Sequence, residues 1–115
     1  MYIGIFFKTL VKGVLEKDIL DKHITCVFKP SAEQEKVMKA YLGKEYAVKV
    51  VGYANDGKNE GLLVEPVDSF PYYGAEKMHI TLSVSKEGKP VNTAFLDFKP
   101  IEEPYTIVGV MGVHP

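Results

Sequence analysis

A histidine and a threonine separated by one residue occur twice in this chain, as His23-Ile24-Thr25 and as His79-Ile80-Thr81. An imidazole titrates near pH ~6.5, so one histidine of a pair can accept a proton while the other donates one. A threonine hydroxyl can donate a hydrogen bond to a phosphate oxygen on which negative charge develops. Residues in this pattern are suited to in-line attack of water on a phosphodiester.

Each motif opens a short apolar run, residues 22–28 and residues 78–84, rich in β-branched and aliphatic residues. Such runs are typical of β-strands. Side chains alternate between the two faces of a strand, so the histidine and threonine of each motif should share one face, with the isoleucine on the other. If both strands belong to one sheet, the two histidines and two threonines could converge on one small phosphate site.

Other elements must position these two strands. Apolar and β-branched runs predict further strands at residues 2–8, 45–53, 61–67, 93–98 and 105–113. The turn-forming residues 55–59 predict a hairpin between two of them. A helix is expected over residues 31–43, because Ser31 can cap its first turn, apolar residues follow at helical spacing, and Gly43 can end it.

Three segments are expected to lack regular structure. Residues 10–20 predict a loop or a short turn of helix, because Gly13 weakens a helix. Residues 68–77 form a connection, and residues 102–104 (Glu-Glu-Pro) form a break. The order of elements predicts an α+β fold with a mostly antiparallel sheet, and the length suits a single domain over residues 1–115.

Composition and charge narrow the class of protein. The net charge is −1 and all fourteen basic residues are Lys, which argues against binding along a long nucleic acid and leaves a small anionic ligand open. No apolar run has the length of a membrane helix, and no basic segment precedes the apolar start, so neither a membrane partner nor a signal peptide is expected. The single cysteine, Cys26, cannot form an internal disulfide and favours a cytoplasmic protein.

A pair of His-x-Thr motifs on strands of a small α+β chain resembles the 2H phosphoesterase superfamily, and residues 2–7 are similar to that family's opening strand. The family includes RNA 2′,3′-cyclic phosphodiesterases, 2′,5′-ligase-like proteins and viral enzymes that degrade cyclic or 2′,5′-linked oligonucleotides. The resemblance implies a small bilobal fold, in which pseudo-two-fold related motif strands face each other across a cleft. It implies no metal or other cofactor.

The resemblance also implies roles for the motif residues. His23 and His79 match the paired catalytic histidines, and Thr25 and Thr81 match the hydroxyls that hold the phosphate. The sequence leaves open which histidine is the base; we take His79 as the base and His23 as the acid. Many family members are longer, and because this chain contains no Arg, any cationic contact must come from Lys.

Four aromatic residues are candidates for stacking on a nucleobase. Tyr72 and Tyr73 precede the second motif, and packing in the core or in a lid is an equal alternative for them. Tyr2 and Phe6 share one face of the first predicted strand, where core packing is the favoured alternative. Lys89, in a predicted turn, is a candidate phosphate contact or a solvated side chain, and Asn92-Thr93 offers further hydrogen bonds.

The other residues that could bind a metal or react give weaker functional signals. No third ligand stands at a recognisable spacing from the two motif histidines, so no metal site is expected. Cys26 should lie on the apolar face of its strand, which favours packing over nucleophilic chemistry. His114, next to the last residue of the sequence, is expected at the surface.

These observations predict a metal-independent phosphodiesterase that hydrolyses a 2′,3′-cyclic phosphate or a short cyclic or 2′,5′-linked oligonucleotide. The partner would be a small nucleotide, a cyclic oligonucleotide or an RNA end. A module of the same fold that binds a nucleotide or an RNA end without turnover is the alternative, and a structural protein with coincidental motifs is a third. The sequence leaves open the linkage, the base preference and the oligomeric state.

Overall fold

In the computed structural model, which describes residues 1–8 and 10–115, one antiparallel sheet of seven strands forms the body of the described chain. The sheet order is β2-β6-β5-β4-β7-β1-β3. The strands are β1 (Tyr2–Phe6), β2 (Lys17–Asp18), β3 (His23–Phe28), β4 (Glu45–Asn55), β5 (Asn59–Pro66), β6 (His79–Val84) and β7 (Lys99–His114). Two short helices accompany them, α1 (Ala32–Lys39) and the 3-10 helix η1 (Pro90–Phe95). The predicted α+β fold with a mostly antiparallel sheet is confirmed.

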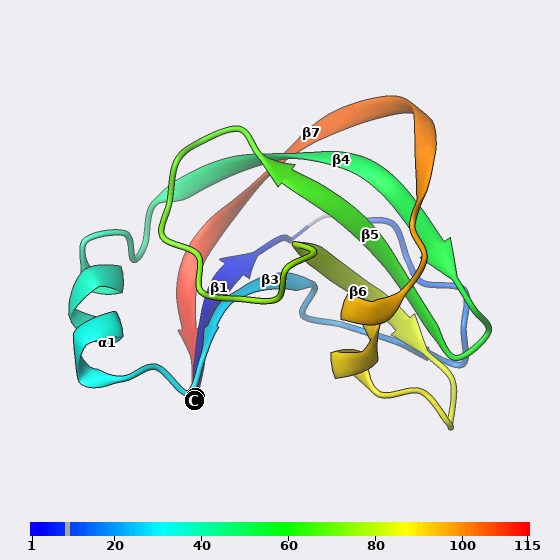
Figure 1. The fold of residues 1–115 in the computed structure, drawn as a ribbon, viewed down its shortest axis with the longest axis horizontal. Coiled ribbons are helices and arrows are strands. Elements are labelled where there is room, and N and C mark those ends of the chain that lie inside the picture. Colours follow the sequence, from blue (N-terminus) through cyan, green and yellow to red (C-terminus); the bar gives the residue numbers. More distant parts are fainter. Residues whose placement is uncertain (9) are drawn as a thin grey trace.

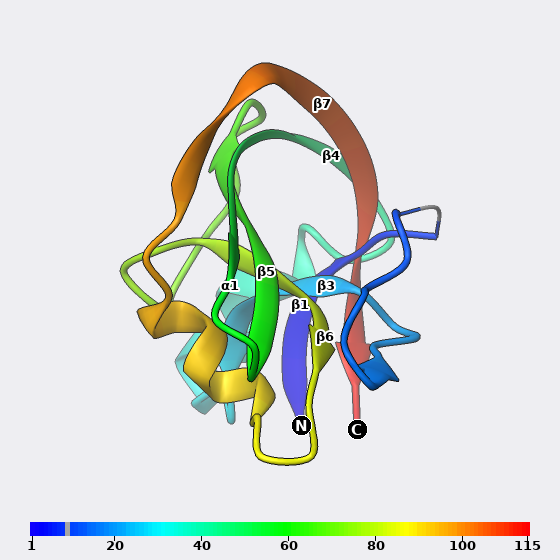
Figure 2. The ribbon, with the colours of Figure 1, turned by 90° about the vertical axis from the view of Figure 1, so that its right-hand side faces the viewer.

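The sheet is strongly curved, and the curvature brings its two ends together (Figures 1 and 2). β3 is the edge strand at one end, and β6 lies next to the edge at the other end, yet the two strands contact each other. The long strands β4, β5 and β7 arch over them. Strand twist and bulges produce such curvature. The two motif strands, separated by four strands in the sheet order, therefore lie side by side.

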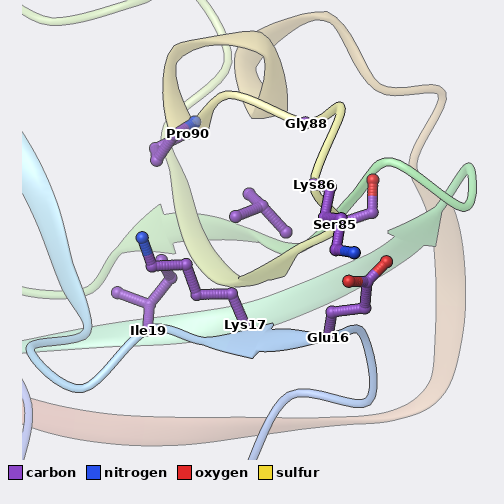
Figure 3. A pocket seen from close by; sticks show the side chains of 8 residues that line it. Glu16, Lys17, Ile19, Ser85, Lys86, Gly88 and Pro90 are labelled. Carbon is purple, nitrogen blue, oxygen red and sulfur yellow. The ribbon is translucent and has the colours of Figure 1, made fainter.

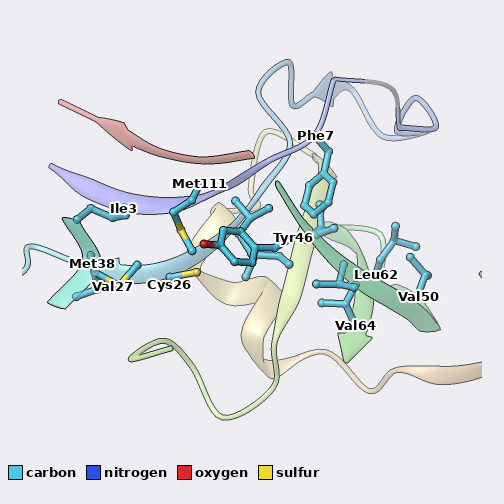
Figure 4. Close-up of a cluster of buried hydrophobic side chains, with 14 of the residues drawn as sticks. Ile3, Phe7, Cys26, Val27, Met38, Tyr46, Val50, Leu62, Val64 and Met111 are labelled. Carbon is cyan, nitrogen blue, oxygen red and sulfur yellow. The ribbon is translucent and has the colours of Figure 1, made fainter. Parts of the chain in front are cut away.

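The hydrophobic core is enclosed by the curved sheet (Figure 4). The apolar faces of the motif strands contribute Ile24 from β3 and Ile80 from β6, which are buried together with Ile3 and Ile5 from β1. Burying one such side chain contributes roughly 1.5–3 kcal/mol to the stability of the folded state. The motif strands are held in place by the isoleucine between each histidine and threonine.

The predicted strands at residues 2–8, 45–53 and 61–67 are present as β1, β4 and β5. The predicted hairpin joins β4 to β5. Its turn is built by Asp56, whose carboxylate accepts hydrogen bonds from the backbone N–H groups of Lys58 and Asn59. Gly57 has φ +86°, a conformation that glycine adopts without a steric cost.

The predicted helix starts where the sequence indicates but ends earlier. The Ser31 hydroxyl accepts a hydrogen bond from the backbone N–H of Gln34, whose side chain accepts one from the Ser31 N–H, a capping box. The helix ends at Lys39, so the prediction that it extends to Gly43 is wrong. The following residues form a turn in which Gly43 has φ +76°. In the described part of the chain, no helix has the length and hydropathy needed to cross a membrane.

The strand predicted at residues 93–98 is wrong, because the first half of this segment belongs to η1 and the second half has no regular structure. Pro90 at the first position has a φ that suits a helix start and needs no hydrogen-bond acceptor. The hydroxyl of Thr93 is buried and hydrogen-bonded to the Asn59 side chain, so a tertiary contact decides the conformation here. Sequence periodicity over so few residues carries no sign of that contact.

The break predicted at residues 102–104 is also wrong, because β7 runs without interruption from Lys99 to His114. β4 pairs Val50 with Tyr105 and Gly52 with Pro100, so residues 101–104 bulge out of this ladder. A proline cannot donate to a ladder, and a bulge removes that requirement. The turn-forming residues thus bend the strand without ending it.

Residues 10–20 form a loop without a helical turn, and the loop contains the two-residue strand β2. The loop is held by buried or partly buried acceptors: the N–H of Gly13 donates to the Asp18 carboxylate, and the N–H of Val14 donates to the Glu60 carboxylate. The Lys22 ammonium, itself buried, also donates to Asp18, at 2.9 Å. This pair fixes the chain directly before β3.

Candidate active site

Both His-Ile-Thr motifs line one cavity of about 580 Å³ on the side of β3 and β6 that faces away from the core. Its walls are completed by β1, by η1 and by the loops before β3 and β6. The residues around it are Tyr2, Ile19, His23, Thr25, Phe28, Tyr73, Gly74, Ala75, His79, Thr81, Pro90, Val91 and Ala94. Among the described residues, no Lys, Asp or Glu lines this cavity. We call it the histidine cavity.

The predicted alternation of side chains is present in both motifs. His23 and Thr25 are half-buried and line the histidine cavity, whereas Ile24 between them is fully buried on the other face. The same pattern holds for the second motif, where Ile80 is the buried residue. The structure therefore brings the two histidines and two threonines to one place.

Both motif strands carry a β-bulge one residue after the threonine. Cys26 is the extra residue in the ladder between β1 and β3, and Leu82 is the extra residue in the ladder between β5 and β6. A bulge shifts the alternation of side chains, and bulges commonly re-aim residues beside functional sites. Phe28 consequently lines the histidine cavity, although simple alternation from Thr25 would point it to the core.

The two imidazoles are oriented in the same way. The Nδ1 atom of His23 lies 2.7 Å from the carbonyl oxygen of Asp21, and the Nδ1 atom of His79 lies 2.7 Å from the carbonyl oxygen of Lys77. A carbonyl oxygen only accepts, so each Nδ1 carries the proton and donates it. Each Nε2 atom is left as the position at which the ring can exchange a proton with a ligand.

His23 lies against aromatic rings from β1. Its ring centroid is 4.7 Å from that of Tyr2, with 24° between the planes, and 5.4 Å from that of Phe6. Burial lowers the pKa of the His23 imidazole, and the charges of His114 and His79 lower it further, while the carbonyl and carboxylate of Asp21 raise it. The net effect is a lowered pKa, which favours the neutral ring.

Thr81 is held by a buried hydrogen-bond chain. Its hydroxyl oxygen lies 2.8 Å from that of Thr93, which in turn accepts a hydrogen bond of 3.0 Å from the Asn59 amide. The same amide nitrogen donates to the carbonyl of Lys89 at 2.7 Å. The Thr81 hydroxyl donates to Thr93, and its oxygen also lies 3.4 Å from the carbonyl oxygen of Pro90. These contacts fix the position of the Thr81 side chain in the lining of the histidine cavity.

Two aromatic residues at the rim of the histidine cavity present open surface. Tyr73 is 45% exposed and Phe28 is 64% exposed, and both line the cavity. The backbone N–H of Tyr73 donates to the carbonyl of Cys26 at 2.7 Å, which holds the loop before β6 against β3. Exposed aromatic faces beside a cavity are suited to stacking on a planar ligand such as a nucleobase.

Three of the sequence-predicted substrate residues lie elsewhere. Tyr72 is outside the cavity lining: its hydroxyl donates to the carbonyl of Ala75 at 2.6 Å, and burial raises its pKa to about 12. Lys89 is exposed and also lies outside the lining. Its backbone carbonyl accepts a hydrogen bond from the Asn59 amide. Phe6 does not line the cavity but packs against His23, whereas Tyr2 does both.

Cys26 is buried on the core side of β3, where the sequence places it. Burial raises the pKa of its thiol to about 12. A thiol in this setting is protonated and packed, which is the expected structural role.

A second hollow lies between β2 and the turn that follows β6 (Figure 3). It is lined by residues that include Glu16, Lys17 and Lys86, and its charged side chains are exposed. It contains none of the motif residues. Within residues 1–8 and 10–115, no three His, Cys, Asp or Glu side chains gather as they would around a metal ion.

Sequence reasoning missed several contributors to the site. One wall of the cavity is formed by three residues of η1 that belong to no recognisable motif: Pro90, Val91 and Ala94. Phe28 was hidden by the bulge, which alternation alone does not predict. His114 is exposed, as the sequence predicts, but it also stacks on Tyr2 with ring centroids 4.9 Å apart. Its strand pairing with β1 was the missing information.

No protein-family model matches this chain, and a comparison with curated proteins finds no similar sequence.

Proposed function

We propose that this protein is a metal-independent phosphodiesterase of the 2H phosphoesterase type, which hydrolyses a 2′,3′-cyclic phosphate or a short cyclic or 2′,5′-linked oligonucleotide. The observation that carries the proposal is the single cavity lined by both histidines and both threonines. The shared bulge and the shared Nδ1 hydrogen bonds support a pseudo-two-fold relation between the motif strands. A bilobal fold of that family is part of the proposal.

The charge of the cavity supports a phosphodiester rather than a polyphosphate. Among the described residues around it, the two histidines are the groups that can become positive near neutral pH. One protonated histidine balances the single negative charge of a diester. The higher charge of a nucleoside triphosphate would lack partners here, because a buried charge is costly unless it is paired.

The reaction is a hydrolysis in which water is added across one P–O bond. One neutral histidine takes a proton from water at its Nε2 while the water oxygen forms a bond to phosphorus. The bond from phosphorus to the leaving oxygen breaks, and the other, protonated histidine gives its proton to that oxygen. The Thr25 and Thr81 hydroxyls donate to the phosphate oxygens on which charge develops. Proton exchange with solvent restores both histidines.

A nucleotide substrate is supported by the rim of the cavity. Tyr73 and Phe28 offer exposed rings, and Tyr2 lines the cavity beside His23. A base stacked on such a ring contributes about 1–3 kcal/mol without a strong preference among bases. For a 2′,3′-cyclic end, the expected product by analogy with the family is a 2′-phosphate.

The test is hydrolysis of a substrate panel in EDTA between pH 5 and pH 9. The panel contains 2′,3′-cyclic nucleotides, 2′,5′-linked oligoadenylate and cyclic di- and trinucleotides. We expect turnover of at least one member with a bell-shaped pH profile, and a loss of at least about a hundredfold in His23→Asn and in His79→Asn. Thr106→Val, an exposed change on β7 outside the cavity, is the matched control and should retain activity.

The alternative binding module gives a different result in the same experiment. Nucleotide binding that depends on His23 and His79, without product at any pH, would replace the phosphodiesterase by that module. If the unaltered protein is folded by circular dichroism and neither binds nor cleaves any member of the panel, both functions are contradicted.

A further inference from the structure

An aromatic column connects the histidine cavity to the end of β7. The Tyr2 ring stacks on His23 at 4.7 Å and on His114 at 4.9 Å, with only 8° between the Tyr2 and His114 planes. β1 lies between β3 and β7 in the sheet, so the Tyr2 ring has one imidazole from each neighbouring strand. We call His23, Tyr2 and His114 the aromatic column.

Two paired glycines lie beside the column, Gly4 of β1 and Gly112 of β7. A side chain at Gly4 would clash with the backbone of Ile24, and one at Gly112 would contact the Phe6 ring, so both positions stay free for close packing. Tyr2 and Phe6 are four residues apart, which is roughly 13 Å along a strand, yet their ring centroids lie 6.0 Å apart. The two rings therefore lean toward each other over Gly4. His23 packs against both rings and is shielded from water on that side.

We infer that His114 is a positioning residue that acts through Tyr2 to keep His23 as the proton-accepting member of the histidine pair. This inference rests on the proposed hydrolytic function. His23 would take the proton from water, and His79 would give its proton to the leaving oxygen. The assignment reverses the sequence-based choice of His79 as the base.

The charges around His23 favour this assignment. Asp21 from the preceding loop, Tyr2 from β1, His79 from β6 and His114 from β7 are the titratable groups that face it. A proton on His114 repels a proton on His23, because the two rings are held at a fixed spacing on either side of Tyr2. Burial acts in the same direction, and both lower the pKa of His23 against the opposing influence of Asp21. No aromatic stack is recorded for His79 within the described residues.

The first test is an NMR titration of the His23 ring in the intact protein, in His114→Phe and in His114→Ala. The phenyl ring preserves the stack and removes the charge, so the pKa of His23 should rise in His114→Phe. It should rise further in His114→Ala, because the ring that shields Tyr2 is also lost. Lys49→Gln removes an exposed positive charge on β4 and should leave the titration unchanged.

The second test is the pH profile of kcat/KM for the cleaved substrate in the same variants. A base with a raised pKa is protonated at higher pH, so the acidic limb should move upward in His114→Phe. At pH 6 kcat/KM should fall about two- to tenfold, as for one charge removed at a short distance, while activity above pH 8 is retained. A purely structural defect would lower activity at all pH values.

The outcomes separate this inference from the proposed function. An unchanged His23 titration in His114→Phe overturns the role of His114, whether or not the protein is active. Movement of the alkaline limb instead of the acidic limb overturns the assignment of His23 as the base. Absence of turnover on every substrate overturns the base role together with the proposed function, whereas a moved His23 titration would still show the coupling to His114.

Discussion

The histidine cavity has two halves, one on β3 and one on β6, that begin from the same tripeptide and are completed differently. In both halves the isoleucine is buried, the histidine Nδ1 donates to a carbonyl two residues earlier, and a bulge follows the threonine. The β3 half adds aromatic packing around its histidine. The β6 half adds a buried hydrogen-bond chain behind its threonine.

The two halves therefore differ in which side chain the neighbouring residues constrain. In the β3 half the neighbours act on the proton affinity of His23, since aromatic rings exclude water and carry no hydrogen-bonding atom at the ring face. In the β6 half the neighbours hold the Thr81 side chain in place, since its hydroxyl donates to Thr93, which also accepts a hydrogen bond from the Asn59 amide. Among the described residues the Thr25 hydroxyl has no such hydrogen bond, so the Thr81 side chain is the more firmly held of the two.

The largest expected effect comes from removing either histidine. His23→Asn and His79→Asn should each lower kcat by about a hundred- to ten-thousand-fold, because each removes one proton transfer. His23→Asn should abolish the acidic limb of the pH profile, and His79→Asn should abolish the alkaline limb. The double variant should lose little more than either single variant, because residues that act as a unit are not additive. Steady-state kinetics across pH measure this, and loss of the same limb in both variants would remove the functional distinction between the halves.

The next effect concerns the two threonines. Thr81→Val should lower kcat by about a hundred- to a thousand-fold, as expected for one oriented donor to a developing charge. Thr25→Val should cost less, about tenfold, because no hydrogen bond within the described residues fixes the position of the Thr25 hydroxyl. Kinetics of both variants at the pH optimum compare the halves directly, with Thr106→Val as control. Equal losses would contradict the special role of the β6 half.

A smaller effect is expected for the residue behind Thr81. Thr93→Val removes the hydroxyl that joins Asn59 to Thr81 and should lower kcat about tenfold. Denaturant unfolding should show a loss of roughly 1–3 kcal/mol, because a buried amide N–H loses a partner. Thr93→Ser keeps the hydroxyl and is the matched control, expected to retain most of the activity. An inactive Thr93→Ser with an active Thr93→Val would show that the packing of the methyl group, not the hydrogen bond, matters.

The smallest effect is on the pH dependence of stability. Burial lowers the pKa of His23 in the folded protein, so below the unfolded value of about 6.5 the unfolded chain binds this proton more readily. The free energy of unfolding should therefore decrease as the pH falls through about 6.5. In His23→Gln this part of the decrease should be absent. Urea unfolding at pH 8, 7, 6 and 5 compares the two proteins, and identical slopes would show that the β3 half does not perturb its histidine.

Much of the fold was predictable because its signals are local. Strands are present where residues 2–8, 45–53 and 61–67 predict them, although the first ends at Phe6, since β-branched runs and the turn between β4 and β5 determine them locally. The errors at residues 93–98 and 102–104 have tertiary causes. A buried hydrogen bond from Asn59 supports η1, and a bulge against β4 allows Pro104 within β7.

The residues of the candidate site were likewise predicted only in part. Tyr73 and Tyr2 were predicted and line the histidine cavity, whereas Tyr72 and Lys89 were predicted and lie outside it. Sequence distance from a motif does not specify which side chain of a neighbouring pair turns inward. That choice depends on hydrogen bonds such as the one from the Tyr72 hydroxyl to Ala75.

The sequence by itself determined the two motif strands and the face on which each histidine and threonine lies, because strand alternation is a property of the local backbone. Only the tertiary structure decided that the two strands meet, since this depends on the curvature of a whole sheet whose order separates them by four strands. The tertiary structure also decided which residues pack against each half of the histidine cavity. His114 reaches Tyr2 through pairing between β7 and β1, and Thr93 reaches Thr81 through η1, and neither distance is encoded in local sequence.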